Sequence, residues 1–296
     1  MSTLELDRLT KTFGTGDATV RALTDLSLTV NPGEVYGFVG SNGAGKSTAM
    51  RITLGVLSAD AGEARVDGER INDDIRRTIG YMPEERGLYD KERIADQLVF
   101  FGKIHGLTKQ KAQQTTADLL DQLGLADRAD SKLEELSLGN QQRVQLAASL
   151  VHDPAILILD EPFSGLDPVA VNVMSEMLLQ KASEGVPVLF SSHQLDLVQR
   201  LCHRVGIITH GEMRAEGTVD ELRTRGPVLY EVRTTARDWY PAGTTVTDTT
   251  EDAVILDAGG IDDQTILSAA MSAGPVHGFI RRVPDLNELF KEVVTS

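Results

Sequence analysis

The stretch GSNGAGKST at residues 40–48 combines glycines with a lysine and hydroxyl residues, in the spacing G-x-x-x-x-G-K-[ST]. Glycines let the backbone approach phosphate oxygens, and amides at a helix start donate to them. We expect Lys46 to reach the β- and γ-phosphates of ATP, Ser47 to ligate Mg²⁺ and Thr48 to support the α-phosphate side. The predicted phosphate-binding loop consists of Gly40, Ser41, Asn42, Gly43, Ala44, Gly45, Lys46, Ser47 and Thr48.

Two carboxylates, Asp160 and Glu161, follow a buried apolar run in the stretch ILILDEPFSGLDP. Ligands of open α/β sheets bind beyond the carboxyl ends of the strands, so this pair is predicted to lie beside the phosphate loop. Asp160 can hold Mg²⁺, which leaves Glu161 to polarise the water that attacks the γ-phosphate. An acidic strand end that only caps the next helix is the alternative, and the phosphate loop makes it the weaker one.

A histidine, His193, ends the next strand in VLFSSHQLD. A lone histidine is more often structural, but a neighbouring strand end places this one where it can donate to the γ-phosphate and sense whether ATP is present. His152 is interpreted as a surface or helix-end residue. Cys202 is interpreted as a packed thiol because it continues an apolar helical pattern.

A second anion site is predicted in LSLGNQQRV, residues 136–144. Ser137 can cap a helix whose first amides are unsatisfied and partly positive. The chain's own loop already holds its phosphates, so this helix start makes sense as half of a site that another molecule completes.

The order of elements that must position these residues predicts an α/β fold. Strands alternate with helices after the phosphate loop, which indicates a parallel sheet covered on both faces. Alternating residues near the start predict antiparallel strands, residues 90–136 predict a helical insertion, and residues 209–227 read as a linker. A small α+β unit follows. The expected domains are 1–222, with a helical subdomain at about 85–150, and 223–296.

Composition narrows the function. The net charge of −15 disfavours binding of nucleic acid, which needs a surplus of Lys and Arg. No apolar run approaches the roughly 20 residues of a membrane helix, and the first residues lack the pattern of a signal peptide. The single cysteine has no disulfide partner within the chain, as expected in a reducing compartment.

In this order, the motifs resemble those of the ATP-binding subunit of ABC transporters. They are GSNGAGKST, LSLGNQQRVQLAASL, AILILDEP, SGLD and SSHQLD, and the resemblance covers about residues 2–222. PEERGLYDK and the small C-terminal domain look most like the sodium- and drug-export (NatA-like) branch. The resemblance implies a P-loop core of ABC type, with an antiparallel β-subdomain and a helical subdomain. It also implies hydrolysis of ATP to ADP and phosphate, a cytoplasmic location on the inner face of the membrane, a transmembrane permease partner and a second ATP-binding domain, as a homodimer.

The resemblance also assigns residues. Phe13 would stack on adenine, where most members have tyrosine, and residues 85–89 would face the groove that receives the membrane subunit. Glu84 stands where the family has glutamine and would serve catalysis as a metal-linked group. Leu138 and Asn140 depart from the family's LSGGQ pattern. The residues expected to reach a partner's ATP are Ser137, Gly139, Gln141 and Asp167.

Two other functions stay open at this stage. One is a soluble ABC-type ATPase that acts on ribosomes or DNA, which a single cassette and an acidic chain disfavour. The other is a nucleotide sensor without turnover, which conflicts with Glu161. The C-terminal domain is expected either to support the dimer or to be a stabilising appendage.

Overall fold

The computed structural model of the chain describes residues 1–85, 87–224, 227–282 and 285–295. Its backbone contacts divide it into two units, Met1–Glu216 and Gly217–Ser296. The sequence analysis places the boundary slightly later, between residues 222 and 223. Unit 1 contains two sheets and unit 2 contains one, and each unit has its own cluster of buried apolar side chains.

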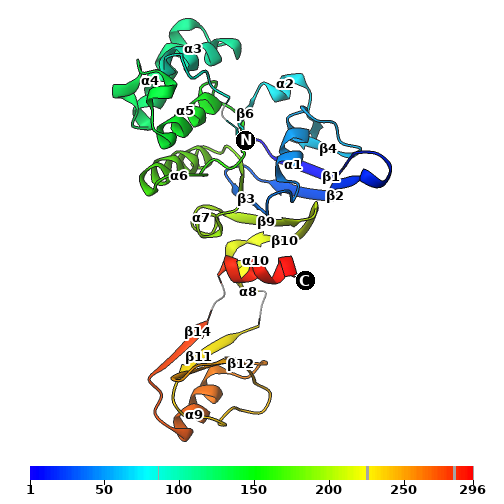
Figure 1. The fold of residues 1–296 in the computed structure, drawn as a ribbon, viewed down its shortest axis with the longest axis vertical. Coiled ribbons are helices and arrows are strands. Elements are labelled where there is room, and N and C mark those ends of the chain that lie inside the picture. The colour runs from blue at the N-terminus through cyan, green and yellow to red at the C-terminus, as the bar shows by residue number, and fades with distance from the viewer. Residues whose placement is uncertain (86, 225–226, 283–284, 296) are drawn as a thin grey trace. The chain divides into compact units, whose positions relative to one another are not determined.

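The first sheet of unit 1 has four strands in the order β2-β1-β4-β5, all antiparallel (Figure 1). Leu4 and Leu6 face the core while Glu5 and Asp7 face outward, so the prediction of antiparallel strands with one wet face is confirmed. The strands are β1 (Leu4–Phe13), β2 (Val20–Val30), β4 (Ala61–Val66) and β5 (Glu69–Arg70).

The second sheet has six strands in the order β10-β9-β3-β8-β7-β6. Strand β3 is parallel to β8 and β9, and β7 is parallel to β6 and β8. Every residue of β3 and β7 is buried, as in strands covered on both faces. The strands are β3 (Val35–Val39), β6 (Ile79–Met82), β7 (Ile156–Leu159), β8 (Val188–Ser192), β9 (Arg204–Thr209) and β10 (Glu212–Thr218).

Helix α1 follows the phosphate loop, and its Ala49 and Met50 belong to a core cluster that also takes side chains from both sheets. This shared core fixes the loop between the sheets. The remaining helices outside the helical subdomain are short or cover the sheet. They are α1 (Lys46–Thr53), α2 (Asp73–Arg76), α6 (Pro168–Ser183), α7 (Leu195–Leu201) and the 3-10 turn Gly16–Ala18.

The predicted helical insertion is confirmed. Three helices contact one another and form a group at one end of the unit (Figure 1). They are α3 (Ile94–Ile104), α4 (Lys109–Gln122) and α5 (Leu138–Leu150), with 3-10 turns at Ala126–Arg128 and Leu133–Glu135 between α4 and α5.

Unit 2 holds an antiparallel sheet in the order β12-β13-β11-β14, with Ile266 and Ala270 of α9 in its core. Tyr230 stacks on Phe279, with ring centroids 4.9 Å apart. Helices α8 and α10 contact each other. The elements are α8 (Val219–Thr224), β11 (Leu229–Arg233), β12 (Thr245–Thr249), β13 (Ala253–Asp257), α9 (Asp263–Ala273), β14 (Gly278–Arg282) and α10 (Leu286–Thr295).

Two features of the fold differ from the predictions. The linker prediction for residues 209–227 is wrong, because β10 and α8 lie there. Strand β12 was not predicted, and all five of its residues are exposed. Both strands lie at a sheet edge, where hydrogen bonds to a neighbouring strand hold a segment that has little apolar pattern of its own. Within the described residues, no helix is long and apolar enough to cross a membrane.

Candidate active site

The phosphate loop runs from the end of β3 into α1, and its conformation requires glycine. Gly43 and Gly45 have φ of +80° and +109°, in the region that side chains disfavour. At Gly40 a Cβ would lie 2.6 Å from the carbonyl oxygen of Ile208, so a larger residue would clash with β9. The loop predicted from the sequence is therefore formed as a tight turn ahead of a helix N-terminus.

Lys46 is almost fully buried in this loop. Its Nζ donates to the carbonyl oxygens of Gly40, at 2.7 Å, and Ser41, at 3.3 Å. It also lies 3.6 Å from Oε1 of Glu161. The ammonium group is thus held over the loop and next to a carboxylate, where it can neutralise the negative charge of phosphate oxygens.

A cavity of about 340 Å³ opens at the loop. The loop residues Asn42 to Thr48 line it together with Ala22, Glu84 and Glu161. The structure therefore brings Glu84, Lys46, Ser47 and Glu161 together around one cavity, although the sequence separates them widely. Their catalytic and metal-binding roles remain predictions.

Asp160 and Glu161 follow β7, as expected, and both are buried. Oδ1 of Asp160 accepts a hydrogen bond of 2.6 Å from the hydroxyl of Ser191 on β8. The backbone amide of Glu161 donates to the same hydroxyl oxygen at 2.8 Å, and Glu161 has φ of +49°. The chain thus turns sharply at Glu161 and directs its side chain toward Lys46.

His193 lies beside Glu161, with its Nδ1 2.9 Å from Oε2 of that carboxylate. Its side chain is half exposed. The other oxygen of Glu161, Oε1, is buried and has no hydrogen-bond partner among the described residues, although it lies 3.6 Å from Nζ of Lys46. One oxygen of Glu161 is therefore oriented by His193, and the other faces the ammonium group of Lys46. The bond to Glu161 leaves Nε2 as the ring nitrogen available to a phosphate.

Glu84 lies in a loop after β6, and helix α5 holds this loop in place. The amide of Gln145, itself buried, donates to the carbonyl oxygens of Pro83, at 2.7 Å, and Glu85, at 3.3 Å. These two bonds flank Glu84 and fix it at the cavity. Of residues 85–89, assigned to a partner groove by the resemblance, position 86 lies outside the described residues.

The stretch that begins at Ser137 does form a capped helix. The Oγ of Ser137 accepts from the amide of Asn140 at 3.4 Å, and α5 starts at Leu138. Gly139 is buried, and a Cβ there would lie 3.1 Å from that of Ala170. The amide of Gln141 donates to two backbone carbonyls at 3.0 Å, so its side chain supports the helix start from within.

Asp167 caps α6: its Oδ1 accepts a 2.9 Å hydrogen bond from the backbone amide of Ala170. The side chain of Asp167 is exposed. Neither Asp167 nor Ser137, Gly139 or Gln141 lines the phosphate cavity. Phe13 lies outside that lining too: it ends β1 with 42% of its surface exposed, and Nζ of Lys11 lies 5.6 Å from its ring centroid. Phe13 is therefore an exposed surface residue and is not packed in the core.

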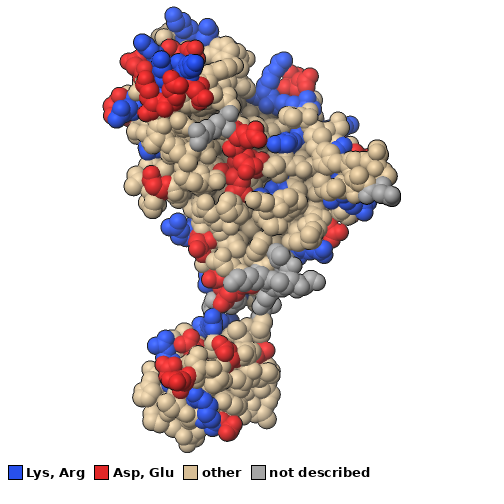
Figure 2. Space-filling model, in the orientation of Figure 1, with Lys and Arg blue, Asp and Glu red and all other residues tan. Residues whose placement is uncertain are grey.

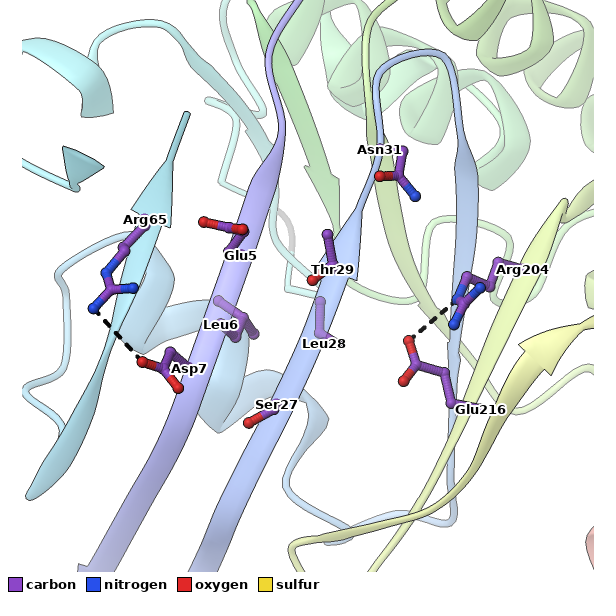
Figure 3. Close-up of a pocket in the computed structure, with 10 residues that line it drawn as sticks. All are labelled: Glu5, Leu6, Asp7, Ser27, Leu28, Thr29, Asn31, Arg65, Arg204 and Glu216. Carbon is purple, nitrogen blue, oxygen red and sulfur yellow. Dashed lines mark hydrogen bonds and ion pairs between the residues drawn. The ribbon is translucent and has the colours of Figure 1, made fainter. Parts of the chain in front are cut away.

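A larger cavity, of about 510 Å³, lies elsewhere on unit 1. Four of its charged side chains form two pairs: Arg65 lies 3.6 Å from Asp7, and Arg204 lies 3.3 Å from Glu216 (Figure 3). No residue of the phosphate loop lines it. The phosphate cavity, which the glycine-rich loop, Lys46 and Glu161 line, is therefore the better candidate for the active site.

Cys202 and His152, which were predicted to have structural roles, agree with the predictions to different degrees. Cys202 is packed as predicted: a Cβ at Gly37 would lie 2.7 Å from its sulfur, and burial raises the pKa of the thiol. His152 lies directly after the C-cap of α5, as the helix-end interpretation predicts, but its side chain is only partly exposed. Its ring stacks on His105 with centroids 3.8 Å apart, and burial followed by the charge of His105 lowers its pKa to about 4.

Comparisons with known proteins identify the family. Residues 23–164 match the family model described as ABC transporter. The chain is 40% identical over 220 residues to the ABC transporter ATP-binding protein YhaQ of Bacillus subtilis, covering 74% of this chain and 72% of that one. It is 36% identical to NatA of the same organism, covering 69% and 84%. Over 97% of its length it is 32% identical to the Nod factor export ATP-binding protein I of Paraburkholderia xenovorans, of which it covers 92%.

Solved structures agree. The structure of an ATP-binding subunit of an ABC transporter superposes with a TM-score of 0.67 at 30% identity, covering 74% of this chain and 91% of that one. A dimeric bacterial ABC transporter cassette superposes with a TM-score of 0.67 at 25% identity, covering 73% and 98%. The chain belongs to the ATP-binding proteins of ABC transporters, and it is an ATPase of P-loop fold, as predicted.

Proposed function

We propose that this chain powers an export transporter as a pair of copies that close face to face on two ATP molecules and act on a separate transmembrane permease. Each ATP would lie between the loop Gly40–Thr48 of one copy and the helix start at Ser137 of the other. The separation of these two segments supports this arrangement, because Ser137 and Asp167 lie outside the cavity that their own chain forms at its phosphate loop. The export direction rests on the printed name of the Nod factor relative.

The observation that carries the catalytic assignment is the buried Oε1 of Glu161, a residue that lines the phosphate cavity. Among the described residues this oxygen has no hydrogen-bond partner, and it lies 3.6 Å from the ammonium group of Lys46. A buried carboxylate oxygen normally has a donor, so this one fits a site for the attacking water. His193 orients the carboxylate through Oε2. Lys46, held over the loop, neutralises the transferred phosphate.

The oxygen ligands here fit Mg²⁺. The hydroxyl of Ser47 and the carboxylates of Glu84 and Asp160 are hard donors. Ser47 and Glu84 line the cavity, whereas Asp160 directly precedes the lining residue Glu161 and is not itself part of the lining. No group of three or more His, Cys, Asp or Glu side chains suited to a metal occurs among the described residues, in keeping with an ion held mainly by substrate phosphates. When bound, Mg²⁺ would neutralise charge on the β- and γ-phosphates.

The alternative of a ribosome- or DNA-acting ATPase has less support. On the face shown in Figure 2, acidic and basic side chains are interspersed, and no broad basic area is visible. A polyanion surface needs clustered Lys and Arg. The permease partner and the position of the chain on the inner face of a membrane are part of the proposal.

The test of the catalytic assignment is Glu161→Gln. The amide keeps the shape but cannot accept a proton, so ATP should still bind while phosphate release falls by about 100-fold or more. A dimer that forms with ATP and persists should accumulate, as measured by light scattering after gel filtration. Glu184→Gln, at an exposed helix end, should hydrolyse ATP as the unmodified chain does. Turnover by Glu161→Gln at the unmodified rate would show that another group is the base.

A further inference from the structure

Ser191 on β8 lies between the two acidic residues that follow β7. It is fully buried and begins the stretch SSHQLD, in which the residue pattern assigns a role to His193 alone. Its hydroxyl donates to Oδ1 of Asp160 at 2.6 Å and accepts from the backbone amide of Glu161 at 2.8 Å. One side chain therefore contacts both carboxylate residues, through a different kind of bond in each case.

The direction of these bonds is fixed by the number of protons. A serine hydroxyl has a single proton, and the carboxylate of Asp160 is the acceptor for it. The amide of Glu161 can only donate, so it must use a lone pair of the hydroxyl oxygen. Oδ1 of Asp160 is thus held by Ser191, and the side chain cannot rotate without breaking that bond. Oδ2 takes no part in this bond.

The second bond supports an uncommon backbone conformation. Glu161 has φ of +49°, which residues with a side chain rarely adopt. The turn directs Oε1 toward Lys46, at 3.6 Å, and Oε2 toward His193, at 2.9 Å. An amide that is hydrogen-bonded to a buried hydroxyl resists the return to extended backbone, which would carry the carboxylate away from the cavity.

We propose that Ser191 is a positioning residue that orients Asp160 for the metal ion and holds the turn that aims Glu161 at the attacking water. The proposal rests on the roles assigned above to Asp160 and Glu161. A hydrogen-bonding neighbour that orients a metal ligand typically contributes about 10- to 100-fold to metal affinity or activity.

The experiment measures metal binding without turnover. Mn²⁺ is titrated into the chain with a non-hydrolysable ATP analogue, and free Mn²⁺ is followed by its electron paramagnetic resonance signal. Ser191→Ala should weaken Mn²⁺ binding by about tenfold or more, while binding of the nucleotide in the presence of a chelator is unchanged. At saturating ATP and Mg²⁺, kcat should fall by a similar factor, with little change in the KM for ATP.

Three further variants separate positioning from folding. Ser191→Thr keeps the hydroxyl and should restore Mn²⁺ affinity, whereas Ser191→Cys keeps the volume and should behave as Ser191→Ala does. Ser149→Ala removes another buried hydroxyl, one that donates to the carbonyl of Leu146 on α5, and should leave Mn²⁺ affinity unchanged. Thermal unfolding of each variant shows whether it is folded at the temperature of the titration.

The outcomes distinguish the positioning role of Ser191 from the roles proposed for Asp160 and Glu161. If Ser191→Ala binds Mn²⁺ and turns over as the unmodified chain does, while Asp160→Asn and Glu161→Gln are impaired, the positioning role is overturned and the assignments of Asp160 and Glu161 stand. If Asp160→Asn itself leaves Mn²⁺ affinity unchanged, the metal assignment fails and the role of Ser191 fails with it.

Discussion

The orientation and the pKa of single side chains in this chain depend on partners that lie far away in the sequence. Oε1 of Glu161 faces Lys46 at the phosphate cavity because Oε2 bonds to His193 and the backbone amide bonds to Ser191. His152 is a second case: its ring is partly buried and stacked on His105, and these surroundings lower its pKa. In both cases the residue type is visible in the sequence, and its chemical state is decided by what packs around it.

The lowered pKa of His152 predicts a dependence of stability on pH. Burial, and then the charge of His105, lower the pKa from 6.5 to about 4, so between these values the unfolded chain binds a proton that the folded chain does not. Stability is therefore fully present above about pH 6.5 and is lost as the pH falls toward 4. When the pH is lowered from 7 to 5, the melting temperature of His152→Phe should fall by less than that of the unmodified chain.

The control for this prediction is His210→Asn. His210 is exposed and has φ of +51°, a conformation that asparagine tolerates. This variant should keep the pH dependence of the unmodified chain. Equal losses of melting temperature in all three proteins would mean that His152 does not contribute to acid sensitivity.

At the scale of elements, the helix α5 connects the two halves of the proposed composite site. Ser137 caps its N-terminus, and its buried Gln145 holds the loop that presents Glu84. A rigid helix can therefore transmit a displacement from one segment to the other. The helix start at Ser137 was predictable, but the partners of the Gln145 amide were not.

Gln145→Met should test this connection. Methionine fills a similar volume but donates no hydrogen bond, so the carbonyls of Pro83 and Glu85 lose their donor. We expect the free energy of unfolding to fall by about 1–3 kcal/mol and hydrogen exchange to become faster in peptides that contain residues 83–85. The matched control is Gln142→Met, since Gln142 is also buried on α5 and its side-chain oxygen has no hydrogen-bond partner. Exchange in those peptides that is equal in both variants would contradict the prediction.

At the scale of the whole molecule, the active site is predicted to be shared between copies. The phosphate loop and Glu161 line one cavity, whereas Ser137 caps a helix outside that lining. An anion site at Ser137 therefore needs a phosphate from elsewhere. The role of the C-terminal unit, as dimer support or as an appendage, remains part of this prediction.

A mixing experiment tests the shared site. Ser137→Arg places bulk and charge against the partner's γ-phosphate, and Glu161→Gln removes the base, so each variant alone should hydrolyse ATP poorly. A mixed pair contains one intact site, made by the loop of the Ser137→Arg copy and the helix start of the Glu161→Gln copy. Phosphate release from an equal mixture should exceed the mean of the two separate rates severalfold. If the mixture matches that mean, each site is complete within a single chain.

The sequence by itself determined the phosphate loop, the acidic strand end, the alternation of strands and helices, and the capped helix at Ser137. These features are short contiguous segments, so their residue types and spacing carry the whole signal. Only the tertiary structure placed Ser191 against Asp160, 31 positions away, and Gln145 against Pro83, 62 positions away. It also decided the edge strands β10 and β12. A polar residue within a buried segment, or a strand held by its neighbour's hydrogen bonds, leaves no local pattern, because the partner that gives it a role lies elsewhere in the chain.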